Sequence, residues 1–252
     1  MNGYTPAELM VAAAAREIQD GEIVFVGMRL PLIAFHLAKR THAPGALGIF
    51  EAGLVRDEPA QELLYTMADP PNIAGASWAT GLWEVMGYLG RGDVHLGFIG
   101  GAEVDVHGNL NTSRIGEGHI PQVQLPGSGG AADIAALAQR FVIIMQHEKR
   151  RLRPRVDFVT SPGYGDGEEW RQRTGLHGGG PSALITTLGV FHFLDEEAVL
   201  QSFHPFTTVE EIAAQTGWKL TCVPDVRPTP RPTAEELQII RSYDPQGFWT
   251  GA

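Results

Sequence analysis

The order of strands, glycine turns and helices near the start of the chain constrains its fold most strongly. Residues 22–27 (EIVFVG) form a continuous apolar run that predicts a buried strand ending in a glycine. Residues 30–42 (LPLIAFHLAKRTH) predict a helix, and residues 46–51 (ALGIFE) predict the next strand. Strand, turn, helix and strand in this order are typical of a βαβ unit. We therefore expect an α/β fold with a mostly parallel sheet flanked by helices.

Later segments continue this rhythm. Further helices are predicted at residues 81–92 and 131–139, and further strands at residues 94–101, 140–147 and 156–163. Residues 182–193 predict two short strands around Gly189, which we interpret as an antiparallel hairpin at the edge of the sheet. These elements predict one α/β domain over residues 1–205.

Helix-capping patterns mark both ends of the chain. Thr5, Pro6 and Glu8 have the spacing of an N-cap, a first helical residue and its capping partner, and the predicted helix extends to about residue 19. Near the other end, residues 207–217 and 233–243 predict two capped helices joined by a proline-rich, extended linker at residues 224–233. We expect residues 206–252 to form a C-terminal helical extension that packs on the domain or on a partner subunit.

The charge and cysteine content exclude several classes of protein. The formal net charge is −10 and no basic stripe is present, so we expect no nucleic-acid partner. Cys222 is the single cysteine, so the chain forms no internal disulfide and has no thiolate cluster for zinc, which fits a cytoplasmic protein. No apolar run approaches the roughly 20 residues that span a bilayer. The N-terminal pattern is not that of a signal peptide, and we expect no membrane partner.

Several catalytic motifs are missing from the sequence. It contains no GxSxG elbow, no P-loop and no HExxH motif, and the glycines after Phe98 do not have GxGxxG spacing. The nine histidines are scattered without a convincing ligand pair, so we predict no metal site. His36, His107 and His147 are candidate pocket residues by position alone.

Glu51 is the most unusual polar residue, because it ends an apolar strand without a cation beside it. The carboxyl ends of parallel strands are where α/β sheets bind ligands. Ala52 and Gly53 follow it and leave space for a substrate to approach. Two interpretations stay open on these residues alone. Glu51 is either a solvated strand end or a reactive carboxylate held in a tight, partly buried turn.

A glycine-rich loop at residues 127–130 (GSGG) precedes the helix that is predicted to begin near Ala131. Gly127, Ser128, Gly129 and Gly130 allow consecutive backbone N–H groups to turn toward a phosphate or toward an oxyanion that develops on a carbonyl. A flexible loop closed by a helix cap is the alternative.

Two other polar segments allow a structural and a functional interpretation. In the turn-rich segment at residues 100–113, Asp105, Asn109 and Asn111 are candidates to line a pocket, although turn formation alone explains them equally well. Gln146–Arg151 (QHEKRR) is a charge cluster after a buried strand. It suits an acidic ligand, a subunit interface or simple solvation.

Taken together, these segments resemble the family I coenzyme A transferases, and most strongly the small (B, or β) subunit of glutaconate CoA-transferase. The resemblance covers nearly the whole chain. It is carried, in order, by VGMRLPLIAFHLAKRTHAP, FEAGL, FIGGAEVDVHGNLNTS, GSGGA, MQHEKRR, VDFVTSPGY, LGVF and TAEELQIIRSYDP. It implies the open α/β fold of CoA transferases, which is also called NagB-like.

The resemblance implies a mechanism. A glutamate at the position of Glu51 is the family's nucleophile, which forms an acyl anhydride and then a glutamyl-CoA thioester. The family's oxyanion motif matches GSGGA, so Gly129 and Gly130 are the implied backbone donors, with Ala52, Gly53, Gly127, Ser128, Ala131, Gly100, Gly101 and Asn109 as pocket candidates. Many relatives have Glu-Asn-Gly or Glu-Ser-Gly where this chain has Glu51-Ala52-Gly53. A carboxylate suits this role because it is ionised at neutral pH without a general base.

The resemblance also implies what the chain acts with. We expect a separate α subunit in an α₂β₂ or larger assembly, an acyl-CoA and a short carboxylic or dicarboxylic acid as substrates, and no permanently bound cofactor. Two alternatives remain. One is an acyl-CoA hydrolase or decarboxylase on the same fold, and the other is a non-catalytic metabolite-binding subunit.

Overall fold

The computed structural model describes residues 3–116, 118 and 120–251, and the chain divides into two compact units. The first unit comprises Met1–Phe98 and Pro230–Ala252, and the second comprises Ile99–Thr229. The segment predicted as a C-terminal extension is thus shared between the units. The division into domains 1–205 and 206–252, whose end residues 1, 2 and 252 lie outside the described residues, stays a prediction.

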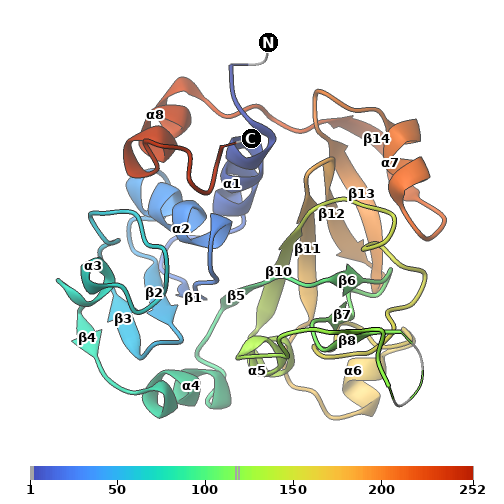
Figure 1. Cartoon of the computed structure of the whole chain (residues 1–252), viewed down its shortest axis with the longest axis horizontal. Helices are drawn as coiled ribbons and strands as arrows, with labels where there is room; N and C mark the ends of the chain where they lie inside the picture. The colour runs from blue at the N-terminus through green and yellow to red at the C-terminus, as the bar shows by residue number, and fades with distance from the viewer. Residues whose placement is uncertain (1–2, 117, 119, 252) are drawn as a thin grey trace. The chain divides into compact units, whose positions relative to one another are not determined.

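The first unit holds the βαβ segment and the last helix of the chain (Figure 1). Its elements are α1 (Pro6–Arg16), β1 (Ile23–Phe25), α2 (Leu30–Arg40), β2 (Leu47–Phe50), β3 (Leu54–Arg56), α3 (Pro70–Ile73), β4 (Trp78–Ala79), α4 (Leu82–Gly90), β5 (Leu96–Ile99), which ends one residue into the second unit, and α8 (Ala234–Tyr243).

The sheet of the first unit has the strand order β5-β1-β2-β3-β4. β1 is parallel to both β5 and β2, with Phe25 paired to Ile49, whereas β3 and β4 are antiparallel additions. The predicted βαβ unit is therefore confirmed, and Glu51 follows the carboxyl end of a parallel strand.

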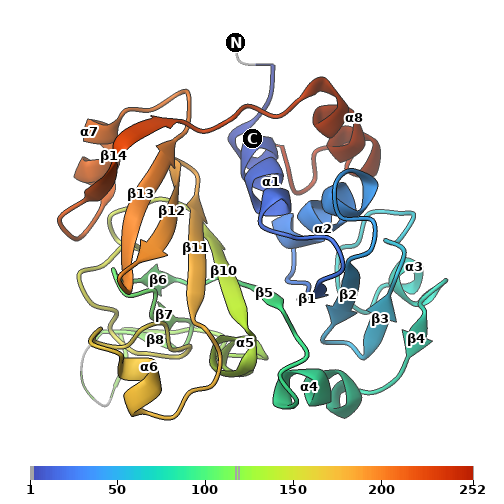
Figure 2. The same cartoon turned by 180° about the vertical axis from the view of Figure 1, so that it is seen from behind.

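Packed helices cover the first unit (Figures 1 and 2). α1 packs on α2, and α8 packs on both. The predicted cap of α1 is present, because the Glu8 N–H donates to Thr5 Oγ1 at 3.1 Å and the Thr5 N–H donates to Glu8 Oε2 at 2.7 Å. Residues near the two ends of the chain also contact each other, because Thr5 Oγ1 donates to the Thr250 carbonyl oxygen at 2.6 Å.

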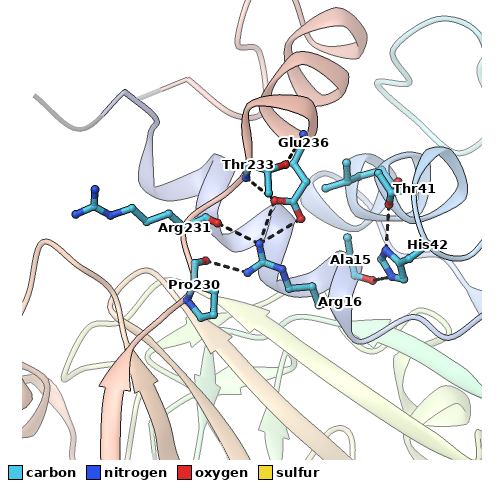
Figure 3. Close-up of polar contacts among 9 residues, drawn as sticks. Ala15, Arg16, Thr41, His42, Pro230, Arg231, Thr233 and Glu236 are labelled. Atoms are coloured by element: carbon cyan, nitrogen blue, oxygen red, sulfur yellow. Dashed lines mark hydrogen bonds and ion pairs between the residues drawn. The ribbon is translucent and has the colours of Figure 1, made fainter.

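Polar contacts join α8 to α1 (Figure 3). The Arg16 guanidinium donates to the Pro230 carbonyl oxygen at 2.9 Å and lies 3.0 Å from Glu236 Oε2. Glu236 also completes the predicted cap of α8, since the Thr233 N–H donates to the same oxygen at 2.7 Å. Charge pairing and capping together place the last helix on the first unit.

The second unit holds the strands β10 to β14 and two short hairpins. Its elements are β6 (Glu103–Val104), β7 (Leu110–Asn111), β8 (Arg114–Ile115), β9 (Val123–Gln124), α5 (Ala131–Leu137), β10 (Arg140–Met145), α6 (Trp170–Arg173), β11 (Pro181–Thr186), β12 (Gly189–Leu194), β13 (Glu197–Phe203), α7 (Val209–Gln215) and β14 (Thr221–Pro228). The sheet order is β10-β11-β12-β13-β14, in which β10–β11 and β13–β14 are parallel and the other pairs antiparallel.

Three sequence predictions change in the second unit. Residues 156–163 do not form the predicted strand. Ser161 alone among them makes a single β-bridge, to Leu110. The antiparallel hairpin around Gly189 is present as β11 and β12, but β13 and β14 lie beyond it, so it is not the sheet edge. Half of the proline-rich linker belongs to β14. Its prolines are tolerated because β14 is an edge strand, where a missing N–H breaks no central ladder.

The α/β class and the flanking helices are confirmed. The strands of each unit contribute apolar side chains to its core, with Phe25 and Ile49 in the first unit and Phe141 and Phe191 in the second at 1% exposure or less. Cys222, on β14, is half-buried and is a free thiol.

Candidate functional site

A three-residue loop carries Glu51 from β2 into β3. Phe50 pairs with Leu54, and the Gly53 N–H donates to the Phe50 carbonyl oxygen at 3.0 Å. Gly53 has φ +89°, a conformation that side-chain-bearing residues rarely adopt. A hairpin loop of three residues that ends in a left-handed glycine is a common connection between antiparallel strands. The predicted tight turn is thus a β-hairpin loop.

The backbone of the segment before α4 closes on this loop. The Thr80 N–H donates to the Gly53 carbonyl oxygen at 2.8 Å. A Cβ added to Gly53 would lie 2.4 Å from the Thr80 carbonyl oxygen and 3.0 Å from the Gly81 carbonyl carbon. Both the turn and the close approach of Thr80 and Gly81 therefore require glycine at position 53.

The Glu51 side chain is half-buried and has no partner within the described part of the chain, where no hydrogen bond or ion pair involves it. Ala52 beside it is exposed, and Gly53 is buried. A carboxylate without a neutralising cation, held on a short fixed loop, is available to attack an electrophile.

The glycine-rich loop lies in the second unit. A hydrogen bond holds each end of the loop. The Gly127 N–H donates to the Thr112 carbonyl oxygen at 2.8 Å, and the Ala131 N–H closes a turn by donating to the Ser128 carbonyl oxygen at 3.0 Å. Gly127 and Gly129 have φ +98° and +49°, so both use the freedom of glycine. Gly130 is the N-cap of α5.

Consecutive N–H groups of this loop have no acceptor among the described residues. No described residue accepts a hydrogen bond from the Gly129 or Gly130 N–H. Adjacent unpaired N–H groups in a glycine turn suit a developing oxyanion. Glu51, Ala52 and Gly53 belong to the first unit, whereas the other predicted site residues belong to the second.

Gly100 and Gly101 follow β5 and differ in their surroundings. Gly100 is exposed, and its nearest contact for an added Cβ is the Ile144 carbonyl oxygen at 3.2 Å. Gly101 is tighter, since an added Cβ would lie 2.8 Å from the Leu110 side chain. The close packing of Gly101 on β7 gives it a structural reason to be glycine, and its place in a substrate pocket stays a prediction.

Asn109 is buried and fully used in the fold. Its Nδ2 donates to Asp105 Oδ2 at 3.0 Å and to the Gly165 carbonyl oxygen at 2.7 Å, and its Oδ1 accepts the Gly163 N–H at 3.0 Å. Burial raises the pKa of Asp105, against which the hydrogen bonds from Asn109 act. These contacts tie two loops together and do not support the predicted role of Asn109 in a pocket.

The candidate histidines have structural partners. His36 stacks on Tyr243 with ring centroids 4.0 Å apart, and His147 contacts Thr186 and Thr216 through its two ring nitrogens. Burial lowers the pKa of His36 and of His147 to about 4. His107 lies 2.9 Å from the Glu196 carbonyl oxygen through Nδ1. In QHEKRR, Glu148 pairs with Arg150 and Arg151, whose hydrogen bonds lower its pKa.

Two buried arginines were not predicted from the sequence. Arg56 and Arg171 are 3% and 4% exposed, and each donates to backbone carbonyl oxygens. Arg171 reaches the carbonyl oxygens of Ala135 in α5, at 2.9 Å, and of Gly163, at 2.9 Å. The position of Arg56 at the end of an apolar strand could have indicated that it is buried, whereas no local sequence pattern indicates this for Arg171.

No group of three or more His, Cys, Asp or Glu side chains within the described residues is arranged to hold a metal ion. No helix that they form has the length and apolar character needed to cross a bilayer.

Comparison with known proteins identifies the family. The model of the coenzyme A transferase family matches residues 7–215. The chain belongs to this family. It is similar to the B subunit of 3-oxoadipate CoA-transferase from Pseudomonas knackmussii, with 36% identity over 97% of this chain and 95% of the relative.

Two further CoA-transferase-like proteins match closely. The B subunit of glutaconate CoA-transferase from Acidaminococcus fermentans is 38% identical over 86% of this chain and 84% of the relative. A crystal structure of glutaconate CoA-transferase from that organism aligns with a TM-score of 0.92 at 33% identity, covering 99% of this chain and 98% of that one. The decarboxylase AibA/AibB aligns with a TM-score of 0.85 at 30% identity, over 99% of this chain and 100% of that one. The expected CoA-transferase fold is confirmed.

Proposed function

We propose that this chain is the B-type, or β, subunit of an acyl-CoA:carboxylate CoA-transferase, with Glu51 as its nucleophile. The observation that carries the proposal is the carboxylate of Glu51, which has no partner among the described residues and sits on a hairpin loop fixed by Gly53. The names of the relatives indicate the substrates. Since glutaconate and 3-oxoadipate are both dicarboxylates, a short dicarboxylic acid is the proposed acceptor or donor.

The proposed reaction begins when a Glu51 oxygen attacks the thioester carbonyl of an acyl-CoA. The tetrahedral intermediate expels the CoA thiolate and leaves an acyl–glutamyl anhydride. The thiolate then attacks the glutamyl carbonyl, which releases the first carboxylate and forms a glutamyl-CoA thioester. The incoming carboxylate attacks this thioester, and the thiolate returns to the new acyl carbonyl, which frees Glu51. No proton is transferred between the reactants, so no general base is required.

The free N–H groups of Gly129 and Gly130 are the proposed donors to the oxyanion of each tetrahedral intermediate. Removal of one such donor typically costs about 2.7–4 kcal/mol of transition-state stabilisation. Gly127, Ser128 and Ala131 shape this loop in the proposal. Ala52 has no polar group, so this chain offers the substrate an apolar methyl beside the nucleophile.

A partner chain completes the proposed enzyme. The relatives carry the names of B subunits, and we propose an A-type, or α, partner in an α₂β₂ or larger assembly that acts in the cytoplasm. Coenzyme A enters as a thioester substrate and becomes part of the covalent intermediate.

The similarity to the decarboxylase AibA/AibB favours one second candidate, a CoA-thioester decarboxylase on the same fold. Steady-state assays of the complex with its A-type partner separate the two functions. CoA transfer from one acid to another that falls on the order of 10⁴-fold in Glu51→Gln supports transfer. Release of CO₂ from a carboxylated acyl-CoA that is unchanged in Glu51→Gln supports decarboxylation and contradicts the proposal. Glu51→Asp is the matched variant, because it keeps a carboxylate that is one methylene shorter.

A further inference from the structure

Arg56, the last residue of β3, carries a buried charge without a carboxylate partner. Arg56 is 3% exposed, and it forms no ion pair in the described part of the chain. Burial lowers the pKa of its guanidinium, although the nearby Tyr243 and Glu58 oppose that shift. A buried cation is costly unless its donors are satisfied, so the partners of this guanidinium decide whether the fold tolerates it.

The guanidinium holds five backbone carbonyl oxygens of one segment. Nε donates to Glu58 at 2.8 Å, and Nη1 donates to Asn72 at 2.5 Å and Ala74 at 2.9 Å. Longer contacts reach Pro71 from Nη1, at 3.4 Å, and Pro59 from Nη2, at 3.5 Å. The planar fork of arginine thus joins both ends of segment 58–74 to β3, which the point charge of a lysine cannot do.

Segment 58–74 is also organised within itself. The Asp69 carboxylate accepts the N–H groups of Tyr65, at 2.6 Å, and Thr66, at 2.9 Å. Asn72, which is fully buried, donates from Nδ2 to the Met67 carbonyl oxygen at 2.6 Å. The segment is therefore hydrogen-bonded within itself. Arg56 attaches both of its ends to β3, and Trp249 Nε1 donates to the Leu64 carbonyl oxygen in its middle at 3.0 Å.

This segment leads back to the loop of Glu51. After residues 75–77, β4 pairs with β3 through Trp78 and Val55, and Thr80, which follows β4, donates its N–H to the Gly53 carbonyl oxygen at 2.8 Å. β4 has two residues and both are exposed, so its own pairing is weak. The closure of Thr80 on Gly53 depends on how firmly segment 58–74 is held.

We propose that Arg56 is a positioning residue for Glu51. By holding segment 58–74 on β3, it keeps Thr80 on Gly53 and fixes the direction of the Glu51 carboxylate. The inference rests on the proposed function of Glu51. Without the guanidinium, the loop samples orientations that are unproductive for attack, whereas the binding of acyl-CoA is unchanged. A displacement of about 1 Å in a reacting group costs on the order of 100-fold in rate.

The test measures the formation of the Glu51-CoA thioester in the complete enzyme. The complex is mixed with saturating acyl-CoA, stopped at intervals, and analysed by mass for the peptide that contains residue 51. For Arg56→Met we expect a rate constant about 10- to 100-fold lower than that of the wild type, with the same final extent and an unchanged KM. Arg56→Lys keeps the charge and recovers part of the rate, and it serves where Arg56→Met does not fold.

Arg241→Met is the matched control. Arg241 also belongs to the first unit and bonds Glu8 through Nε at 2.7 Å and Nη2 at 3.1 Å, and among the described residues no hydrogen bond or ion pair joins it to segment 58–80. This variant is expected to lose stability, because it leaves the buried Glu8 carboxylate without its cation, and to keep the rate constant within about twofold of wild type. Arg56 variants with a wild-type rate constant and only a lower melting temperature would overturn the inference. Absence of any thioester on Glu51 in the wild type would instead contradict the proposed function.

Discussion

Gly53→Ala tests the closed loop around Glu51 by adding a single methyl group. At φ +89° an alanine loses on the order of 1–2 kcal/mol relative to glycine. The added Cβ would also lie 2.4 Å from the Thr80 carbonyl oxygen, about 1 Å inside van der Waals contact, so the loop or Thr80 must move. Overpacking of this kind costs roughly 1–3 kcal/mol. The two terms together predict a loss of about 2–5 kcal/mol.

Gly21→Ala separates the two terms. Gly21 lies in the same unit with φ +78°, and an added Cβ would meet no atom within 4 Å. This control therefore pays only the conformational cost of about 1–2 kcal/mol. Because the loop movement displaces Glu51, Gly53→Ala should also reduce CoA transfer on the order of 100-fold, whereas Gly21→Ala should not.

Urea denaturation and steady-state transfer rates of the two variants give the result. The reasoning predicts that Gly53→Ala loses more stability than Gly21→Ala and is alone in losing activity. Equal stability losses, with full activity in Gly53→Ala, would refute the close approach of Thr80 and the dependence of Glu51 on it.

Two further predictions concern the glycine loop and the buried histidines. Gly130→Pro removes one N–H donor, and the φ of −77° at this residue suits proline. The rate of CoA transfer should therefore fall about 100- to 1000-fold with little change in melting temperature. An unchanged kcat would exclude Gly130 as a donor. The pKa values of His36, His147 and His204 are each lowered from 6.5 to about 4, chiefly by burial, so these side chains are neutral in the folded protein. Since the unfolded chain gains protons below pH 6.5, the free energy of unfolding should be fully present above that pH. It should decrease as the pH falls toward 4, by up to about 3 kcal/mol per histidine, and a flat profile in urea titrations between pH 7 and 5 would contradict this.

Sequence patterns predicted the helix caps and the turn at Glu51 because these features depend on residues that lie close together in the sequence. The cap of α1 uses Thr5 and Glu8, which are three residues apart, and the turn at Gly53 follows directly from the end of β2. The position of Glu51 at a strand end needed only the alternation of apolar strand, glycine and helix.

Long-range contacts account for what the sequence did not predict. Ser161 makes only an isolated bridge, so residues 156–163 have β-like composition without a strand partner. Asn109 binds Gly165, 56 residues away, and Arg56 binds Ala74, 18 residues away, and no local pattern announces either contact. The sequence indicated Gly129 and Gly130 as backbone donors, but only the backbone showed that no described residue accepts a hydrogen bond from their N–H groups.

Chemical trapping of the intermediate tests the central claim most directly. The complex of this chain with its A-type partner is incubated with acyl-CoA without an acceptor acid, reduced with borohydride and digested. If Glu51 forms a CoA thioester, the peptide that contains residue 51 carries an alcohol in place of the carboxylate, and Glu51→Gln gives no such product. An unmodified Glu51 in an enzyme that turns over acyl-CoA would contradict the account.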